Sequence, residues 1–188
     1  MKYILASKSP RRRELLGEII PTFDIITREV DETLPEGVHP REGVELLAVR
    51  KGGAVALENP EALVISSDTL VERDGVPLGK PTDRADAIRM LSSLSGRAHN
   101  VHTGVAVHYK GRAFSGVDST AVYFREMTLS EIEEYVDSGD PMDKAGAYGI
   151  QSGGGKFVEK YDGNYDTVVG LSVALTEKLI REAENDQG

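Results

Sequence analysis

Residues 4–16 read Ile-Leu-Ala-Ser-Lys-Ser-Pro-Arg-Arg-Arg-Glu-Leu-Leu, so that an apolar run meets a Ser-Lys-Ser-Pro turn and three arginines. We expect a buried strand over residues 3–6 and a helix over residues 9–18, because Ser9 suits the helix cap and Pro10 the first helical position. A strand that runs directly into a helix start can bind an anion, since free backbone N–H groups and the positive helix end face the same point.

The arginines at positions 11, 12 and 13 place three positive charges in the first turn of this helix, where the helix dipole disfavours them. A bound polyanion would compensate for that arrangement. The alternative is that the arginines lie on a solvated face and pair with Glu14 and Glu18. We favour the polyanion because all three arginines follow the serines at positions 7 and 9.

Length and charge restrict the class of protein. The chain has 188 residues, 39% of them hydrophobic and 28% charged, which is typical of a globular protein with a substantial core. Its net charge of −9 argues against a long nucleic-acid ligand, while a small polyanion can still bind in a local basic pocket. Cysteine is absent, which excludes thiol catalysis and disulfides. We expect no leader peptide, no membrane span and a cytoplasmic location.

Alternating helical and strand patterns predict an α/β protein with a mixed sheet. Residues 73–75 and 109–112 read as hairpin turns, and residues 146–155 are rich in glycine. Further strands are expected over residues 23–27, 63–67, 69–71, 76–78, 99–108, 113–124 and 156–160. Further helices are expected over residues 40–57, 83–94, 128–136 and 169–183.

Asp68 is the best catalytic candidate. It follows the β-branched strand over residues 63–67, and open α/β sheets bind ligands beyond the carboxyl ends of their strands. An aspartate there can also simply end the strand by bonding the turning backbone. Thr69 adds a hydroxyl, and the next hairpin would bring Lys80 back toward Asp68. A carboxylate beside a lysine favours a role in activating water or binding a metal.

Three other features are ambiguous when taken alone. Lys51 lies in a predicted helix, where lysines are usually solvated. Asp31 and Glu32 can hold a divalent cation through oxygen ligands, or can simply be exposed loop acids. The four histidines show no metal-binding spacing and are interpreted as structural or surface residues.

Residues 153–156 read Gly-Gly-Gly-Lys but do not form a P-loop, because the required earlier glycine and the following Ser or Thr are missing. We expect the glycines to allow a tight bend or the close approach of backbone to a flat ligand. Gln151 precedes them, and its amide can both donate to and accept from the edge of a base.

Five ordered motifs across the whole chain resemble the Maf proteins, which are nucleoside triphosphate pyrophosphatases. They lie at residues 5–12, 67–71, 79–83, 94–97 and 143–151. The last of them, Asp-Lys-Ala-Gly-Ala-Tyr-Gly-Ile-Gln, is similar to the branch that hydrolyses dTTP and UTP.

The resemblance implies an inosine-triphosphatase-like fold in one domain over residues 1–188, with an elongated mixed β-sheet, flanking helices and two lobes around a nucleotide cleft. It implies that Asp68 is the proton acceptor and that Asp31, at an acidic position of the family, joins Asp68 in binding a metal. The positions tied to substrate choice are Arg11, Thr69 and Gln151. The positions expected to touch the phosphates are Ser7, Arg12, Lys51 and Lys80. Gly52 departs from the family, where alanine is usual, and this leaves the reach of Lys51 open.

The function expected from the sequence is hydrolysis of dTTP and UTP, or of modified pyrimidine nucleotides, to the nucleoside monophosphate and pyrophosphate. A divalent cation, Mg²⁺ or Mn²⁺, would assist attack of water on the α-phosphate. A homodimer is an expectation from the family. The alternative is a non-catalytic nucleotide sensor that regulates septation or cell division.

Overall fold

The computed structural model describes residues 1–186, and the chain divides into two compact units. Unit 1 contains residues 1–69, 103–118 and those from 170 onward, whereas unit 2 contains residues 70–102 and 119–169. The sheet has seven strands in the order β2-β1-β3-β5-β6-β7, with β4 paired to β3. Both parallel and antiparallel pairs occur, which confirms the predicted mixed α/β class.

Three strands contribute residues to both units. They are β3 (Ala62–Arg73), β5 (Ala98–Tyr109) and β6 (Arg112–Phe124). The other elements of unit 1 are β1 (Lys2–Leu5), α1 (Pro10–Gly17), β2 (Asp24–Ile25), α2 (Pro40–Ala56) and α6 (Val173–Asn185). The other elements of unit 2 are β4 (Val76–Leu78), α3 (Arg84–Leu94), α4 (Leu129–Asp137), β7 (Val158–Asp162), α5 (Tyr165–Val169) and the 3₁₀ turns η1 (Asp140–Asp143), η2 (Ala145–Ala147) and η3 (Gly153–Phe157).

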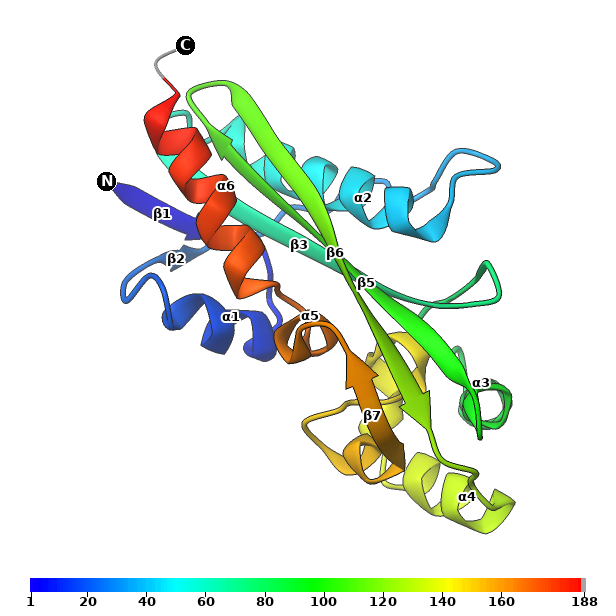
Figure 1. Cartoon of the computed structure of the whole chain (residues 1–188). Coiled ribbons are helices and arrows are strands. Elements are labelled where there is room, and N and C mark those ends of the chain that lie inside the picture. The colour runs from blue at the N-terminus through cyan, green and yellow to red at the C-terminus, as the bar shows by residue number, and fades with distance from the viewer. Residues whose placement is uncertain (187–188) are drawn as a thin grey trace. The chain divides into compact units, whose positions relative to one another are not determined.

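The centre of unit 1 is a parallel pairing of β1 with β2 and β3, in which Leu5 lies opposite Ile25 and Ile65. The inner residues of β1 and β3 (Ile4, Leu5 and residues 63–65) are apolar and buried on both faces of the sheet, because helices cover both sides. The Ser66 side chain bonds a carbonyl of α2, whereas that of Ser67 bonds the Gly170 carbonyl just before α6. Successive side chains of a strand point to opposite faces, so α2 and the start of α6 lie on opposite sides of β3 (Figure 1).

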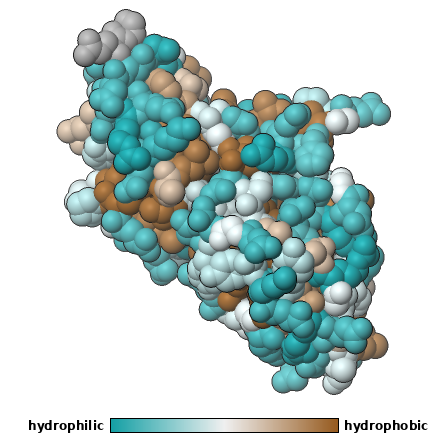
Figure 2. Space-filling view, in the orientation of Figure 1, coloured by the Kyte–Doolittle hydropathy of each residue, from teal (hydrophilic) through white to brown (hydrophobic). Residues whose placement is uncertain are grey.

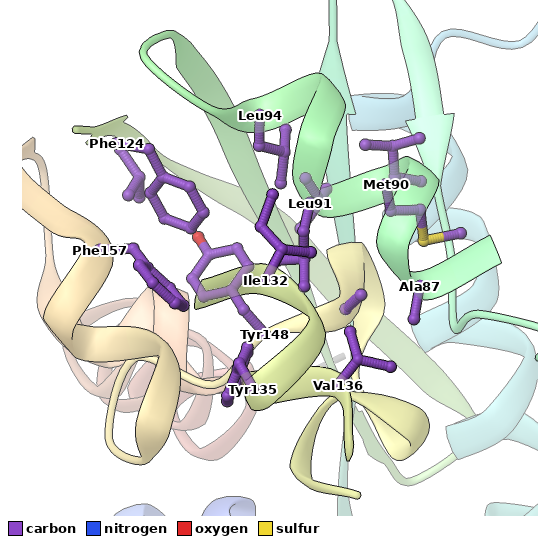
Figure 3. Packing of buried hydrophobic residues seen from close by; sticks show 14 of the residues in the cluster. Ala87, Met90, Leu91, Leu94, Phe124, Ile132, Tyr135, Val136, Tyr148 and Phe157 are labelled. Carbon is purple, nitrogen blue, oxygen red and sulfur yellow. The ribbon is translucent and has the colours of Figure 1, made fainter. Parts of the chain in front are cut away.

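The core of unit 2 lies between its strands and helices α3 and α4 (Figure 3). Phe124, Tyr148 and Phe157 form a cluster with Tyr135, in which the Phe124 and Tyr148 ring centroids are 4.7 Å apart. Helix α4 begins with a capping box, in which Thr128 and Glu131 each bond the other's backbone. The cap fixes the start of α4, whose apolar residues Ile132, Tyr135 and Val136 pack into this core.

The predicted hairpin turns are confirmed. Asp74 and Gly75 both have positive φ between β3 and β4, and Lys110 and Gly111 repeat this between β5 and β6. Two consecutive residues with positive φ form the turn that suits the right-handed twist of a hairpin.

Three predicted boundaries are wrong. The strand expected over residues 156–160 is β7 at Val158–Asp162, because residues 156 and 157 belong to η3. Asp68 does not follow a strand but lies inside β3, which continues to Arg73 by pairing with β4. The helix expected over residues 169–183 is interrupted, because Gly170 adopts a φ of 136° and Ser172 caps a new helix.

Within residues 1–186, no helix is long and apolar enough to cross a bilayer. The visible surface is mainly hydrophilic, with apolar side chains gathered between α6 and α1 (Figure 2).

Candidate functional site

The connection from β1 to α1 forms as the sequence predicts. Pro10 occupies the first turn of α1, and the Ser9 hydroxyl accepts a hydrogen bond from the Arg12 N–H at 3.4 Å. Ser7 is buried, and its hydroxyl accepts from the Ser9 N–H at 3.2 Å. The two serines therefore fix the loop that presents the positive end of α1.

Arg12 connects this loop to β3 and to the segment before α6. Its Nε donates to the Gly170 carbonyl at 2.8 Å, one Nη donates to the Thr69 hydroxyl at 3.1 Å and the other to the Ser7 hydroxyl at 3.4 Å. Burial lowers the pKa of the Arg12 guanidinium, and the Asp68 charge acts in the opposite direction. The structure thus brings together three predicted site residues: Ser7, Arg12 and Thr69.

The carboxylate of Asp68 is paired with Lys51 of α2. The Nζ of Lys51 lies 2.6 Å from Oδ1 of Asp68 and 2.7 Å from Oε1 of Glu32. The Asp68 side chain is 14% exposed, that of Lys51 22% and that of Glu32 60%. Among residues 1–186, the Oδ2 atom of Asp68 accepts no hydrogen bond. One carboxylate oxygen is therefore held by the lysine and the other is available to a reactant.

Gly52 explains how Lys51 reaches Asp68. A Cβ atom at Gly52 would collide with the Ser66 hydroxyl and would lie 2.7 Å from Nδ1 of His108. The glycine thus lets α2 pack directly on β3 and β5, which keeps the neighbouring lysine close to the sheet. The departure from the family pattern at this position supports the reach of Lys51.

Asp31 and Glu32 have different environments. Oδ1 of Asp31 accepts a hydrogen bond from the Thr33 N–H at 2.9 Å, and this interaction lowers the pKa of Asp31. Glu32, which the sequence offered only as a possible cation ligand beside Asp31, is the loop acid that contacts Lys51. Within residues 1–186, no three His, Asp or Glu side chains are grouped so that they could hold a metal ion by themselves. The metal-binding role of Asp31 stays a prediction.

The three arginines at the start of α1 do not act as one group. Arg12 is engaged within the protein, as described above. Arg11 is partly buried and, within the described part of the chain, makes no hydrogen bond or ion pair. Arg13 is exposed and lines a surface pocket with Phe23 and Ile25. Only Arg11 and Arg12 remain candidates for the predicted anion site.

The two other predicted residues, Lys80 and Gln151, belong to unit 2. Both side chains are exposed. The Gly146 N–H donates to the Gly79 carbonyl at 3.1 Å, so the segment before Lys80 is bonded to the segment that leads to Gln151. Convergence of these two residues with Asp68 on one nucleotide stays a prediction.

Sequence reasoning missed several supporting residues. Thr103 is fully buried and shares a hydrogen bond of 3.0 Å with the Thr69 hydroxyl, and the Ser67 hydroxyl bonds the same Gly170 carbonyl as Arg12. A positive φ at Gly170 leaves no signal in a single sequence.

The structural interpretation of the histidines agrees with their contacts, such as that of His99 with the Tyr148 hydroxyl at 2.7 Å.

These features define an α/β protein in which the start of α1 carries Arg11 and Arg12, and in which Asp68 of β3 pairs with Lys51 of α2. The chain belongs to the Maf-like protein family, whose model matches residues 2–183. A protein of Bacillus velezensis named dTTP/UTP pyrophosphatase is 46% identical over 96% of each chain. Proteins of the same name from Moorella thermoacetica (48% identical, 95% of this chain and 93% of the relative) and Vibrio cholerae (46%, 96% and 97%) are equally similar.

A solved structure supports the fold. The Staphylococcus aureus Ham1 protein aligns with a TM-score of 0.51 over 66% of this chain and 72% of that chain. At 16% identity, this likeness is evidence for the fold alone.

Proposed function

We propose that this protein is a nucleoside triphosphate pyrophosphatase that converts dTTP and UTP to the monophosphate and pyrophosphate in the cytoplasm. Membership of the Maf-like family and the names of relatives at 46–48% identity support this activity. The observation that carries the mechanism is the Asp68–Lys51 pair, in which one carboxylate oxygen is fixed at 2.6 Å from the lysine.

The triphosphate would be held by the start of α1 and by the cations around it. Arg12 has five N–H donors and uses three of them within the protein, so two remain for a phosphate oxygen. We propose that Ser7, Arg11, Lys51 and Lys80 provide the other phosphate contacts. Positioning and electrostatic stabilisation supply most of the catalysis in reactions of this kind.

We propose that Asp68 is the general base. Lys51 fixes the carboxylate through Oδ1, and Oδ2 accepts a proton from the attacking water. The water oxygen forms a bond to the α-phosphorus while the bond from that phosphorus to the bridging oxygen breaks. The electron pair of the broken bond leaves with pyrophosphate, and the arginine and lysine side chains stabilise its charge.

The site residues fit a divalent cation that arrives with the nucleotide. Mg²⁺ usually keeps several waters and binds through one or two carboxylates together with substrate phosphates, so it requires no cage of protein ligands. We propose that Asp68 and Asp31 supply the carboxylates. When bound, Mg²⁺ or Mn²⁺ would polarise a phosphoryl oxygen and neutralise developing charge.

We propose that Arg11, Thr69 and Gln151 set the preference for the base. The exposed Gln151 amide has no hydrogen-bond partner within residues 1–186, so it is available to the edge of a pyrimidine. A site that hydrogen-bonds a substrate group rejects analogues that lack the group by about 10⁴-fold in favourable cases.

The test is release of pyrophosphate from a panel of ribo-, deoxyribo- and modified nucleotides with Mg²⁺ or Mn²⁺. Wild-type protein should act on dTTP and UTP, Asp68→Asn should lose turnover and keep its fold, and the exposed Asp162→Asn variant serves as a matched control. Nucleotide binding without any product would contradict the proposal and favour a sensor. Light scattering of the same preparation tests the expected homodimer.

A further inference from the structure

Gln151 lies in a turn of unit 2 that side-chain hydrogen bonds hold at both ends. The turn over residues 149–152 is closed by a hydrogen bond from the Ser152 N–H to the Gly149 carbonyl at 3.2 Å. Gln151 occupies the third of its four positions, with its side chain exposed. Both ends of the turn are attached to the same carboxylate, that of Asp140.

Asp140 reaches the two ends by different routes. Its Oδ2 accepts directly from the Ser152 hydroxyl at 2.6 Å. The same oxygen accepts from the Tyr135 hydroxyl at 2.6 Å, and that hydroxyl in turn accepts from the Gly149 N–H at 3.1 Å. Tyr135 projects from α4 into the aromatic core, where it packs against Phe157 (Figure 3). The turn is therefore linked to the core of unit 2 through two hydrogen-bonded side chains.

Lys144 holds Asp140 in place. Its Nζ lies 2.7 Å from the Asp140 backbone carbonyl and 2.9 Å from Oδ1, so the carboxylate is bonded on both oxygens. The lysine stem also packs against the turn, because a Cβ at Gly149 would lie 2.7 Å from Cε of Lys144. The hydrogen bonds from Ser152, Tyr135 and Lys144 lower the pKa of Asp140, although burial acts in the opposite direction.

The glycines after Gln151 pack against the other side of the turn. A Cβ at Gly154 would lie 2.8 Å from the Gly149 carbonyl oxygen, and one at Gly155 would lie 2.5 Å from that of Ile150. A Cβ at Gly153 would lie 2.8 Å from the ring of Tyr135. The close approach expected of these glycines is therefore to the chain's own turn, which they enclose.

This anchoring matters because an amide on a mobile side chain discriminates poorly between pyrimidines. Uracil presents an acceptor at O4 and a donor at N3, and cytosine presents the reverse. A glutamine amide that rotates by half a turn suits either pattern, since it offers one donor side and one acceptor side. The amide can select one of the two patterns only when the backbone that carries it keeps the side chain in one place, so discrimination requires that the turn itself be held in position.

We propose that Asp140 is a positioning residue for base selection: through Ser152 and Tyr135 it fixes the turn that carries Gln151, and it does so without contacting the nucleotide. This inference rests on the proposed function, because it takes Gln151 to face the base. The chemical class of ligand is a pyrimidine nucleotide with a uracil or thymine edge.

The experiment compares kcat/KM for UTP and CTP in wild type, Asp140→Ala, Asp140→Asn, Gln151→Ala and the Asp140→Ala/Gln151→Ala double variant. The control is Asp137→Ala, an exposed aspartate of α4 that pairs with Arg84. Hydrogen exchange of the peptide over residues 149–152 is measured on the same proteins. Asp140→Ala should lower the UTP-to-CTP ratio by about 10- to 100-fold, as expected when a contact is misplaced by about 1 Å. Asp140→Asn should retain part of the ratio, and Asp137→Ala all of it.

In the Gln151→Ala background, Asp140→Ala should cause no further change of the UTP-to-CTP ratio. In the Asp140→Ala single variant, the peptide over residues 149–152 should exchange hydrogen faster than in wild type. A wild-type ratio in Asp140→Ala would overturn the proposal. If Asp140→Ala does not fold, Ser152→Ala replaces it, because this change removes one anchor and leaves no unpaired buried charge. If wild-type protein hydrolyses no nucleotide, the proposed function fails. Exchange then decides the inference: unchanged exchange in Asp140→Ala overturns it, and faster exchange supports the positioning role.

Discussion

Replacement of Arg12 by methionine should destabilise the protein, whereas the same change at Arg13 should not. Arg12→Met keeps the length of the side chain and removes all of its donors. Two hydrogen bonds of good length are lost, to Gly170 at 2.8 Å and to Thr69 at 3.1 Å, together with a long one to Ser7. Hydrogen bonds that involve a charged group contribute about 1.5–3 kcal/mol each.

The acceptors that remain are not left unpaired. The Gly170 carbonyl still accepts from Ser67 at 3.1 Å, and the Thr69 hydroxyl still pairs with Thr103 at 3.0 Å. No desolvation penalty is therefore added, and the free energy of unfolding should fall by about 3–4 kcal/mol, at the lower end of the sum of about 3–6 kcal/mol for two such bonds.

Urea unfolding monitored by circular dichroism measures this change through the midpoint at constant m-value. Arg13→Met is the matched control, because Arg13 is exposed on the same helix, and exposed substitutions usually change stability by less than about 0.5 kcal/mol. Equal midpoints for the two variants would refute the assignment of Arg12 as the link between α1, β3 and the start of α6.

Three further predictions concern the same unit and the core of unit 2. Gly52→Ala should lower the free energy of unfolding by about 1–3 kcal/mol through overpacking. Gly53→Ala, whose Cβ would lie 3.4 Å from His108, should be neutral or stabilising. If Gly53→Ala were the less stable of the two variants, the packing of α2 described above would be contradicted. Glu32→Gln should lower kcat about 10-fold at saturating metal, because it releases Lys51. Asp31→Asn should instead raise the metal concentration that is required for half-maximal activity. Loss of kcat in Asp31→Asn alone would reverse these two roles. Burial lowers the pKa of His99 from 6.5 to about 4. Between these two pH values the imidazole binds a proton in the unfolded chain but not in the folded one, so the free energy of unfolding falls as the pH drops from 6.5 to about 4. Denaturant midpoints are measured between about pH 7 and 4. The free energy of unfolding should fall by about 3 kcal/mol less in His99→Gln than in wild type over this range. If His99→Gln loses as much stability as the control His39→Asn, the prediction is wrong.

Local signals in the sequence were sufficient for much of the fold. Ser9 and Pro10 mark the start of α1, Asp74 and Gly75 mark a hairpin, and Thr128 begins α4 with its capping box. These features depend on residues that are close in sequence, and such interactions are readable from a single chain.

The errors arose where distant segments decide the structure. Asp68 was placed after a strand because Asp often ends one, but pairing with β4 extends β3 through it. The pairing with β1 nevertheless ends at Leu5 and Ile65, so Asp68 does lie beyond the carboxyl end of the parallel part of the sheet. Asp68 therefore keeps the position relative to the parallel strands that motivated the choice, and binding of a ligand there stays a prediction.

The candidate site was predicted in the same uneven way. The lysine expected near Asp68 was Lys80, and Lys51 was expected only to touch the phosphates, so the pairing of Lys51 with Asp68 was not predicted. The choice of Glu32 over Asp31 as the second partner of Lys51 depends on how a loop folds over α2. Gly52 left the reach of Lys51 open in the sequence analysis, and the packing of α2 on Ser66 shows why the lysine reaches Asp68. The anchors of Gln151 come from Tyr135 and Asp140, which no motif connects to it.

The most direct test of the account is hydrolysis of UTP in water enriched in oxygen-18, with mass spectrometry of both products for wild type and Asp68→Asn. Water that is activated by Asp68 and attacks the α-phosphorus should leave the heavy oxygen in UMP and none in pyrophosphate, and the variant should form almost no product. Heavy oxygen in pyrophosphate, or an undiminished rate in Asp68→Asn, would contradict the account.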